Sequence, residues 1–204
     1  MDLDPMEAVE ATREETEQSQ QDKKKSQLNS LIAITIALLA TFMGICKVKD
    51  DNIVQAMQQA QADKLDHWNY YQARNIREEV ANSTLTQLRL QKPAQPATKN
   101  VGYDKAIAEY QGIADKQKAE KEKLKTQAEG DQKTYDSLNY HDDQFDLSDA
   151  LLAIAISLMA VTSLTQKRWL FIVALVPTFF GVLMGLAGLL GWHIHPDALT
   201  QLLS

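Results

Sequence analysis

Three long apolar runs, separated very unevenly, dominate the pattern of this chain. Residues 26–46, 150–166 and 169–192 contain no acidic or basic side chain. A long polar stretch lies between the first and second runs, whereas only Lys167 and Arg168 separate the second from the third. A helix needs about 20 mainly apolar residues to cross a bilayer. The pattern therefore predicts an all-α membrane protein with three transmembrane helices and one long extramembrane insert.

The expected organisation follows from these runs. Its segments are an acidic tail (1–25), a first membrane helix (26–46), the insert (47–146), a second membrane helix (147–166), a third (169–192) and a tail (193–204). Asp146 is expected to be the N-cap of the second membrane helix. Asp149 would then lie in its first turn, near the positive end of the helix dipole.

The insert has the pattern of a helical hairpin. No glycine or proline lies between Ile45 and Lys92, so the first membrane helix is expected to continue outward as one arm. Two prolines and a glycine then predict a break over residues 92–102. After the break, a heptad seam predicts a second, antiparallel arm: Tyr103, Ile107, Tyr110, Ala114, Gln117, Lys121, Leu124 and Ala128.

Aromatic and apolar residues of both arms form a candidate surface. The outgoing arm has a stripe with spacings near four, made of Leu65, Trp68, Gln72, Ile76 and Val80. Two interpretations stay open for the aromatic side chains: packing between the arms, or a surface for a protein partner that includes Trp68, Tyr70 and Tyr71. The candidate residues for either role are Leu65, Trp68, Tyr71, Arg74, Ile76, Tyr103, Ile107 and Tyr110.

Small residues line one side of each membrane run at spacings of three and four. Such residues let membrane helices approach closely, and Gly181 and Gly185 have the GxxxG spacing of that contact. We therefore expect membrane-helix packing at three sets: Ala33, Ala37, Ala40 and Gly44; Ala150, Ala153, Ser157 and Ala160; and Gly181, Gly185 and Gly188.

Charge gives an orientation and excludes one class of partner. Residues 1–25 hold eight acids and four bases, and residues 47–146 hold seventeen acids and fifteen bases, so neither is a basic nucleic-acid surface. Lysines 23–25 and the Lys167–Arg168 pair flank the runs on one side. The positive-inside rule places that side in the cytoplasm and the insert outside. Lys47 and Lys49 are a counter-signal, although two aspartates follow them.

The acidic N-terminal tail has two interpretations. Its few apolar residues are typical of a solvated tail. Alternatively, Asp4, Pro5 and Glu7 resemble an N-cap, a first-turn proline and an N3 glutamate, which predicts a helix from Pro5 onward.

No residue pattern predicts catalysis, a cofactor or a metal centre. One acidic and histidine-rich group could bind a divalent cation, but helix capping and interfacial solvation explain it more simply: His141, Asp142, Asp143, Asp146, His193 and His195. The apolar runs contain no acid, base or histidine of the kind that transporters and proton relays use. With a single cysteine, Cys46, the chain has no intrachain disulfide.

The stretch from Trp68 to Arg77 (WNYYQARNIR) follows one lysine-flanked run, and this arrangement resembles an uncharacterised bacterial membrane-protein family. That family is domain of unknown function 4337. The resemblance covers residues 23–192 and includes the one-plus-two arrangement of spans; Arg74 and Asn75 depart mildly from its motif. It implies a bacterial inner-membrane location. Because the family has no established activity, the resemblance transfers no catalytic residue.

Together these patterns predict a non-enzymatic, homo-oligomeric inner-membrane protein that presents its hairpin as a scaffold or interaction module. Its expected partners are the lipid bilayer, further copies of itself and an unidentified protein. Two alternatives stay open: a channel or transport accessory subunit whose oligomer forms a pore, and a signalling or sensing protein that uses the acidic tail.

Overall fold

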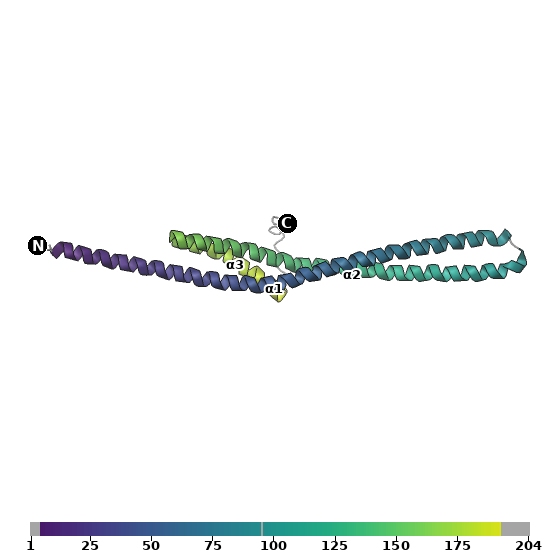
Figure 1. Cartoon of the computed structure of the whole chain (residues 1–204), viewed down its shortest axis with the longest axis horizontal. Helices are drawn as coiled ribbons and strands as arrows, with labels where there is room; N and C mark the ends of the chain where they lie inside the picture. The colour runs from purple at the N-terminus through teal and green to yellow at the C-terminus, as the bar shows by residue number, and fades with distance from the viewer. Residues whose placement is uncertain (1–4, 95, 193–204) are drawn as a thin grey trace. The chain divides into compact units, whose positions relative to one another are not determined.

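The computed structural model describes residues 5–94 and 96–192, and this part of the chain is helical apart from short connections at residues 96, 166–167 and 191–192. Helix α1 (Pro5–Gln91) is followed by two short 3₁₀ turns, η1 (Lys92–Ala94) and η2 (Ala97–Lys99). Helices α2 (Asn100–Thr165) and α3 (Arg168–Leu190) complete the chain (Figure 1). The predicted all-α class is confirmed. The expected C-terminal tail and the expected N-cap Asp4 lie outside the described residues.

The chain divides into two compact units. One comprises Met1–Ile53 with Tyr140–Ser204, and the other comprises Val54–Asn139. Helices α1 and α2 contribute to both units, and α3 belongs to the first. The two units are called the three-helix unit and the two-arm unit below.

Each of the three helices contains an 18-residue window that is long and apolar enough to cross a membrane. The mean hydropathies of these windows are 2.2, 1.9 and 2.4 for α1, α2 and α3. By length and composition, the three helices are therefore compatible with a membrane protein.

Helix α1 is longer than the first apolar run on both sides. It begins at Pro5, so the helical alternative for the N-terminal segment is the one observed. Proline suits this first position because its fixed φ matches a helix and its missing N–H would have no helical partner there. The helix then runs without interruption through Cys46 and Val54 and ends at Gln91, two residues before Pro93.

Helix α2 is also continuous, which corrects one expectation. Asp146 does not cap a helix; it lies in the interior of α2. The chain has neither glycine nor proline between Gly130 and Lys167, so nothing interrupts the backbone hydrogen bonds before the second apolar run. As a consequence, Asp142, Asp146 and Asp149 are spaced four and three residues apart on one face of α2.

The connection between α2 and α3 is tight. Gln166 has a positive φ of 55°, and its N–H donates to the carbonyl of Thr162 at 2.8 Å, which closes the last turn of α2. At the other end of α3, Gly191 has a φ of 69° and the N–H of Trp192 donates to the carbonyl of Ala187 at 2.9 Å. This is the Schellman arrangement, which uses the conformational freedom of glycine to satisfy the last carbonyls.

The three-helix unit has an apolar core to which each helix contributes. Its buried members are Leu28, Ile32 and Leu39 of α1, Leu152 and Met159 of α2, and Ala174 of α3. Partly buried side chains, among them Phe42 and Phe171, complete it.

Three glycines of α3 lie where larger neighbours approach most closely. A Cβ atom built on Gly181 would lie 2.8 Å from Cγ of Leu152 and 3.2 Å from Cβ of Leu151. At Gly185 it would lie 2.7 Å from the ring of Phe42, and at Gly188 2.7 Å from the ring of Phe145. Because these three glycines have no side chains, α1 and α2 can pack closely against α3.

The two-arm unit pairs the C-terminal part of α1 with the N-terminal part of α2. Residues that contact one another become closer in sequence toward the turn: His67 with Asp131, Arg74 with Gln117, Arg89 with Gln111, and Lys92 with Asp104. This order means that the two segments run antiparallel. Ala81, Leu85 and Ala114 form their small apolar core, against which Ile107 and Tyr110 pack.

We predict that Gly181→Ala destabilises the three-helix unit by about 1–3 kcal/mol, because Leu151 and the fully buried Leu152 leave no room for a methyl group. Gly44→Ala is the matched control, since nothing lies within 4 Å of the Cβ position there. Thermal unfolding in detergent, followed by circular dichroism, should give a lower midpoint for the first variant alone. Equal midpoints for the two variants would contradict the described packing.

Candidate functional site: a charged cluster between α1 and α2

An ion pair on α1, between the exposed Lys47 and the buried Asp50, forms one side of a polar site in the three-helix unit. The ammonium group of Lys47 donates to Oδ2 of Asp50 at 2.8 Å and lies 3.4 Å from Oδ1 of Asp51. The Asp50 side chain is only 5% exposed. Its second oxygen, Oδ1, is buried and has no hydrogen-bond partner. Such an acceptor is costly unless a donor reaches it.

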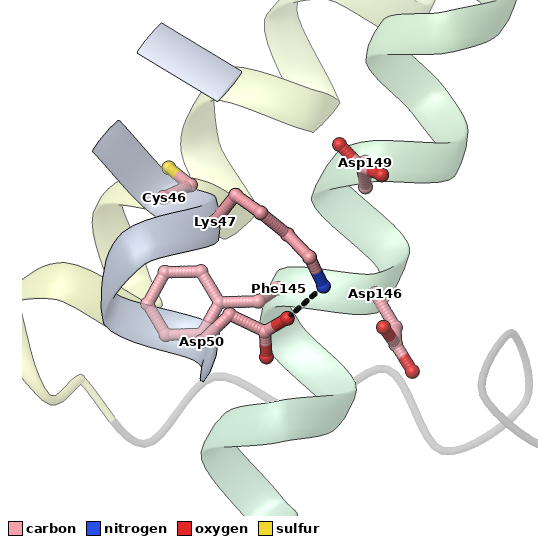
Figure 2. Close-up of a pocket in the computed structure, with 6 residues that line it drawn as sticks. All are labelled: Cys46, Lys47, Asp50, Phe145, Asp146 and Asp149. Carbon is pink, nitrogen blue, oxygen red and sulfur yellow. Dashed lines mark hydrogen bonds and ion pairs between the residues drawn. The ribbon is translucent and has the colours of Figure 1, made fainter. Parts of the chain in front are cut away.

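The facing side of the site comes from the acidic face of α2. Asp146, Asp149 and Phe145 line a cavity together with Cys46, Lys47 and Asp50 (Figure 2). The cavity has a volume of about 20 Å³, which is room for a single water molecule. One helical turn before Asp146, the carboxyl of Asp142 lies close enough to that of Asp50 to form a hydrogen bond when one of the two is protonated.

The electrostatics of the site favour bound protons. Burial raises the pKa of Asp142 to about 7, and the hydrogen bond and charge of Asp50 and the charges of Asp146 and Asp143 act in the same direction. Burial, then the charge of Asp50, also raise the pKa of Asp146, against which Lys47 acts. The pKa of Lys47 is raised because its ammonium donates to Asp50. The site therefore contains one cation, Lys47, whose charged form is stabilised, and carboxyl groups that lose their protons at a higher pH than usual.

Residues beside the cluster connect α2 to the end of α3. Gln144 is almost fully buried, and its side-chain amide donates to the backbone carbonyl of Trp192 at 2.8 Å. Nδ1 of His141 lies 3.1 Å from Oε1 of Gln144. Of the six residues considered for a divalent cation, His193 and His195 lie outside the described residues. In residues 5–94 and 96–192, no three His, Cys, Asp or Glu side chains are placed to hold a metal ion.

The two-arm unit has a polar network of its own at the middle of its seam. Arg74 donates to Oε1 of Gln117 at 3.1 Å and lies 2.8 Å from Glu120. One turn further along α1, Lys121 of α2 lies 2.7 Å from Glu78, and both side chains are largely buried. Lys121 also donates to Asn75. These contacts place charged groups at positions that a coiled coil usually fills with apolar residues.

A second pairing lies closer to the start of the arms. Nδ1 of His67 is 2.6 Å from Oδ2 of Asp131, and Lys64 donates to Gln132 at 2.7 Å. On the α1 side of the same region, the rings of Trp68 and Tyr71 meet edge to face, with centroids 5.3 Å apart.

The structure separates the candidate residues of the arms into two groups. All eight members of the seam on α2 are buried or half-buried, as are Trp68, Tyr71 and Arg74 on α1. Leu65 and Ile76 are instead exposed, as are Gln72 and Val80 from the same stripe. The seam that α1 presents to α2 runs through Lys64, Tyr71, Glu78 and Leu85, every seven residues.

The small residues of the three apolar runs fall into two groups, one buried and one exposed. Gly181, Gly185 and Gly188 are buried against α1 and α2. Two sets are exposed: Ala33, Ala37, Ala40 and Gly44 on α1, and Ala153, Ser157 and Ala160 on α2. The stripes of α1 and α2 thus face away from the core of their own chain.

The spacing of charged residues on α1 predicts part of the charged cluster, although their number does not. Lys47 and Asp50 are three residues apart, a spacing that brings the two side chains together on a continuous helix. Counted only as flanking charges, they give a weak orientation signal. The contact with Asp142 joins residues 92 positions apart in sequence, and local spacing does not predict it.

The sequence model of a domain of unknown function (DUF4337) matches residues 28–191. The chain belongs to this family. The matched region of this DUF4337 protein includes nearly all of the three apolar runs, both arms and the charged cluster. No curated protein and no solved structure matches the chain.

We predict that Lys47→Gln lowers the unfolding midpoint of this DUF4337 protein, because the buried carboxylate of Asp50 loses the cation that compensates it. A loss of about 1 kcal/mol is expected, because a neutral amide donor replaces a charged one at a buried carboxylate. Lys49→Gln, on the exposed side of the same helix turn, is the control and should change little. Thermal unfolding at pH 8 checks this, and a midpoint unchanged by Lys47→Gln would argue against a buried Asp50.

Proposed function

We propose that this DUF4337 protein is a non-enzymatic, oligomeric inner-membrane protein with three membrane spans. It presents an extramembrane antiparallel hairpin, the two-arm unit, as a scaffold or interaction module. The observation that carries the proposal is that the small-residue stripes of α1 and α2 face outward, away from the core of their own chain.

The surface of the apolar windows supports a location in lipid. Large apolar side chains are exposed on every helix, including Leu38 on α1, Ile154 on α2, and Ile172 and Phe179 on α3. In water this surface would be costly, whereas in a bilayer it matches the solvent. The polar hydroxyls within the windows, such as Thr35, Thr41 and Ser157, donate to carbonyls one turn earlier on their own helix.

The outward stripes support association between copies. Helices in lipid gain little from apolar burial and instead associate through close packing at small residues. Each chain covers the glycine-rich face of α3 with its own α1 and α2, so that face is already used. Ala33, Ala37 and Ala40 are not covered by the chain itself. A second copy, which lies in the same bilayer with the same orientation, supplies a complementary stripe.

The two-arm unit supports a role as an interaction module. Its polar seam is occupied by its own second arm, so this seam does not need another chain. Other chains would meet its outer face, where Leu65, Ile76 and Val80 are exposed. For orientation, lysines 23–25 and the Lys167–Arg168 pair favour a cytoplasmic N-terminus, which puts the hairpin outside.

We predict that single cysteines on the α1 stripe report the association. In a Cys46→Ala background, Ala37→Cys should form a disulfide-linked dimer on mild oxidation in nanodiscs or native membranes, because small-residue stripes of neighbouring copies approach closely. Leu38→Cys is the matched control: it is also exposed and lies at nearly the same depth, but on another face.

The predicted dimer should also appear without crosslinking. Native mass spectrometry in detergent should find a species above one chain, and replacing Ala37 by Leu should reduce it. A monodisperse monomer at micromolar concentration, or equal crosslinking of the two cysteine variants, would overturn the proposal of self-association through this stripe.

The proposed orientation predicts opposite accessibility on the two sides of the membrane. In the Cys46→Ala background, Ser83→Cys on the two-arm unit should react with a membrane-impermeant maleimide in intact spheroplasts. Ser19→Cys in the N-terminal part of α1 should react only after lysis. Both positions are exposed in the structure, so a difference reports sidedness. The reverse pattern would mean the inverted topology.

A further inference from the structure

One carboxylate oxygen of Asp50 is buried and accepts no hydrogen bond. Oδ2 of this carboxylate accepts from Lys47, while Oδ1 is buried without a partner. Asp50 projects from α1 toward the acidic face of α2, where it lines the cavity with Asp146 and Asp149 (Figure 2). A buried acceptor in this position needs a donor.

Asp142 is placed to be that donor when it carries a proton. It precedes Asp146 by one turn on the same face of α2, and its carboxyl lies within hydrogen-bonding reach of the carboxyl of Asp50. Two ionised carboxylates at such a distance repel one another. A single proton converts the repulsion into an O–H···O⁻ hydrogen bond, which is among the stronger hydrogen bonds in proteins.

We propose that Asp50 and Asp142 share one proton, and that this carboxyl–carboxylate pair is a pH-sensitive lock between α1 and α2. In the locked form the O–H of Asp142 donates to Oδ1 of Asp50, whose Oδ2 keeps its bond to Lys47. Raising the pH transfers the proton to water and leaves two negative charges facing one another across the helix contact.

The surrounding charges strengthen this dependence on pH. Besides the pair itself, α1 contributes Cys46, Lys47 and Asp51, and α2 contributes the acids and histidine nearest to it: His141, Asp143, Asp146 and Asp149. Between Trp169 and Leu190, α3 has no ionisable side chain. Lys47 is the one lysine in this set, and it already pairs with Asp50. Each proton that a carboxyl group of the cluster releases therefore adds a negative charge that Lys47 does not balance.

The sign of the effect follows from the pKa of Asp142, which is raised from 3.8 to about 7, first by burial and then by Asp50. Between these two values the folded protein binds more protons than the unfolded chain. The free energy of unfolding contributed by this pair therefore falls as the pH rises from about 4 to about 7, and it falls no further above that. The pair titrates as a unit, so the measured midpoint belongs to both carboxyls.

Infrared difference spectroscopy of the full-length protein in nanodiscs tests the shared proton directly. Spectra recorded between pH 5 and pH 9 should show a protonated-carboxyl stretching band that disappears with a midpoint near 7. The band should be missing in Asp142→Asn and retained in Asp136→Asn, an exposed aspartate of α2 six residues earlier. Loss of the wild-type band already below pH 5, or its persistence in Asp142→Asn, would overturn the proposal.

Unfolding midpoints test the lock. The side-chain amide introduced by Asp142→Asn can donate to Asp50 at any pH, so this variant should unfold at the wild-type midpoint at pH 5 and at a higher midpoint at pH 8. Asp142→Glu restores a titrating carboxyl and should regain a fall in midpoint between these pH values, which separates a lost proton from a misfolded protein. A constant difference between Asp142→Asn and wild type across this range would overturn the lock.

Discussion

The close contact between α2 and α3 is the constraint on which the three-helix unit depends. The ring of Phe145 packs against Gly188, and the side chain of Leu152 packs against Gly181. Both contacts are so close that neither glycine could carry a Cβ atom without a shift of its neighbour. Because Phe145 and Leu152 are seven residues apart on α2, these two contacts fix the rotation of α2 about its axis. Gln144 fixes it further by bonding to the end of α3. With α2 held in this way, its acidic face is directed at Lys47 and Asp50.

The charged cluster has a different character from the core beside it. Apolar packing tolerates small shifts, whereas a buried carboxylate is stable only while its partners remain in place. Asp50 has one permanent partner, Lys47, and depends for its other oxygen on the protonation of a residue of α2. The position of α2 relative to α1 at this level is consequently linked to pH as well as to packing. In a protein with few polar groups inside its apolar windows, this is a site where solution conditions can act.

Much of the helical architecture could be predicted from the sequence, for identifiable reasons. Pro93 and Pro96 mark the end of α1, and the seven-residue pattern from Tyr103 to Ala128 indicates the buried face of α2. The prediction that Asp146 is an N-cap was wrong, because an aspartate that precedes an apolar run resembles an N-cap even when the helix is continuous. The contact between Asp50 and Asp142 was not predictable from spacing, since it depends on how α3 orients α2. On α1, hydrophobicity favours the stripe from Leu65 to Val80, yet the face in contact with α2 contains Lys64, Tyr71 and Glu78.

Polar contacts between the two arms determine how the residues of α1 are aligned with those of α2. Its apolar core is small: one cluster has Ala81, Leu85 and Ala114 as buried members, and the other buried apolar residues described are Met57, Ala60 and Ala128. So small a core provides little packing energy to distinguish the observed alignment from one shifted by a heptad. The same shift would separate Lys121 from Glu78 and Arg74 from Glu120, and would leave largely buried charges without partners. Apolar contacts thus hold the arms together, while the charged pairs determine which residues face each other.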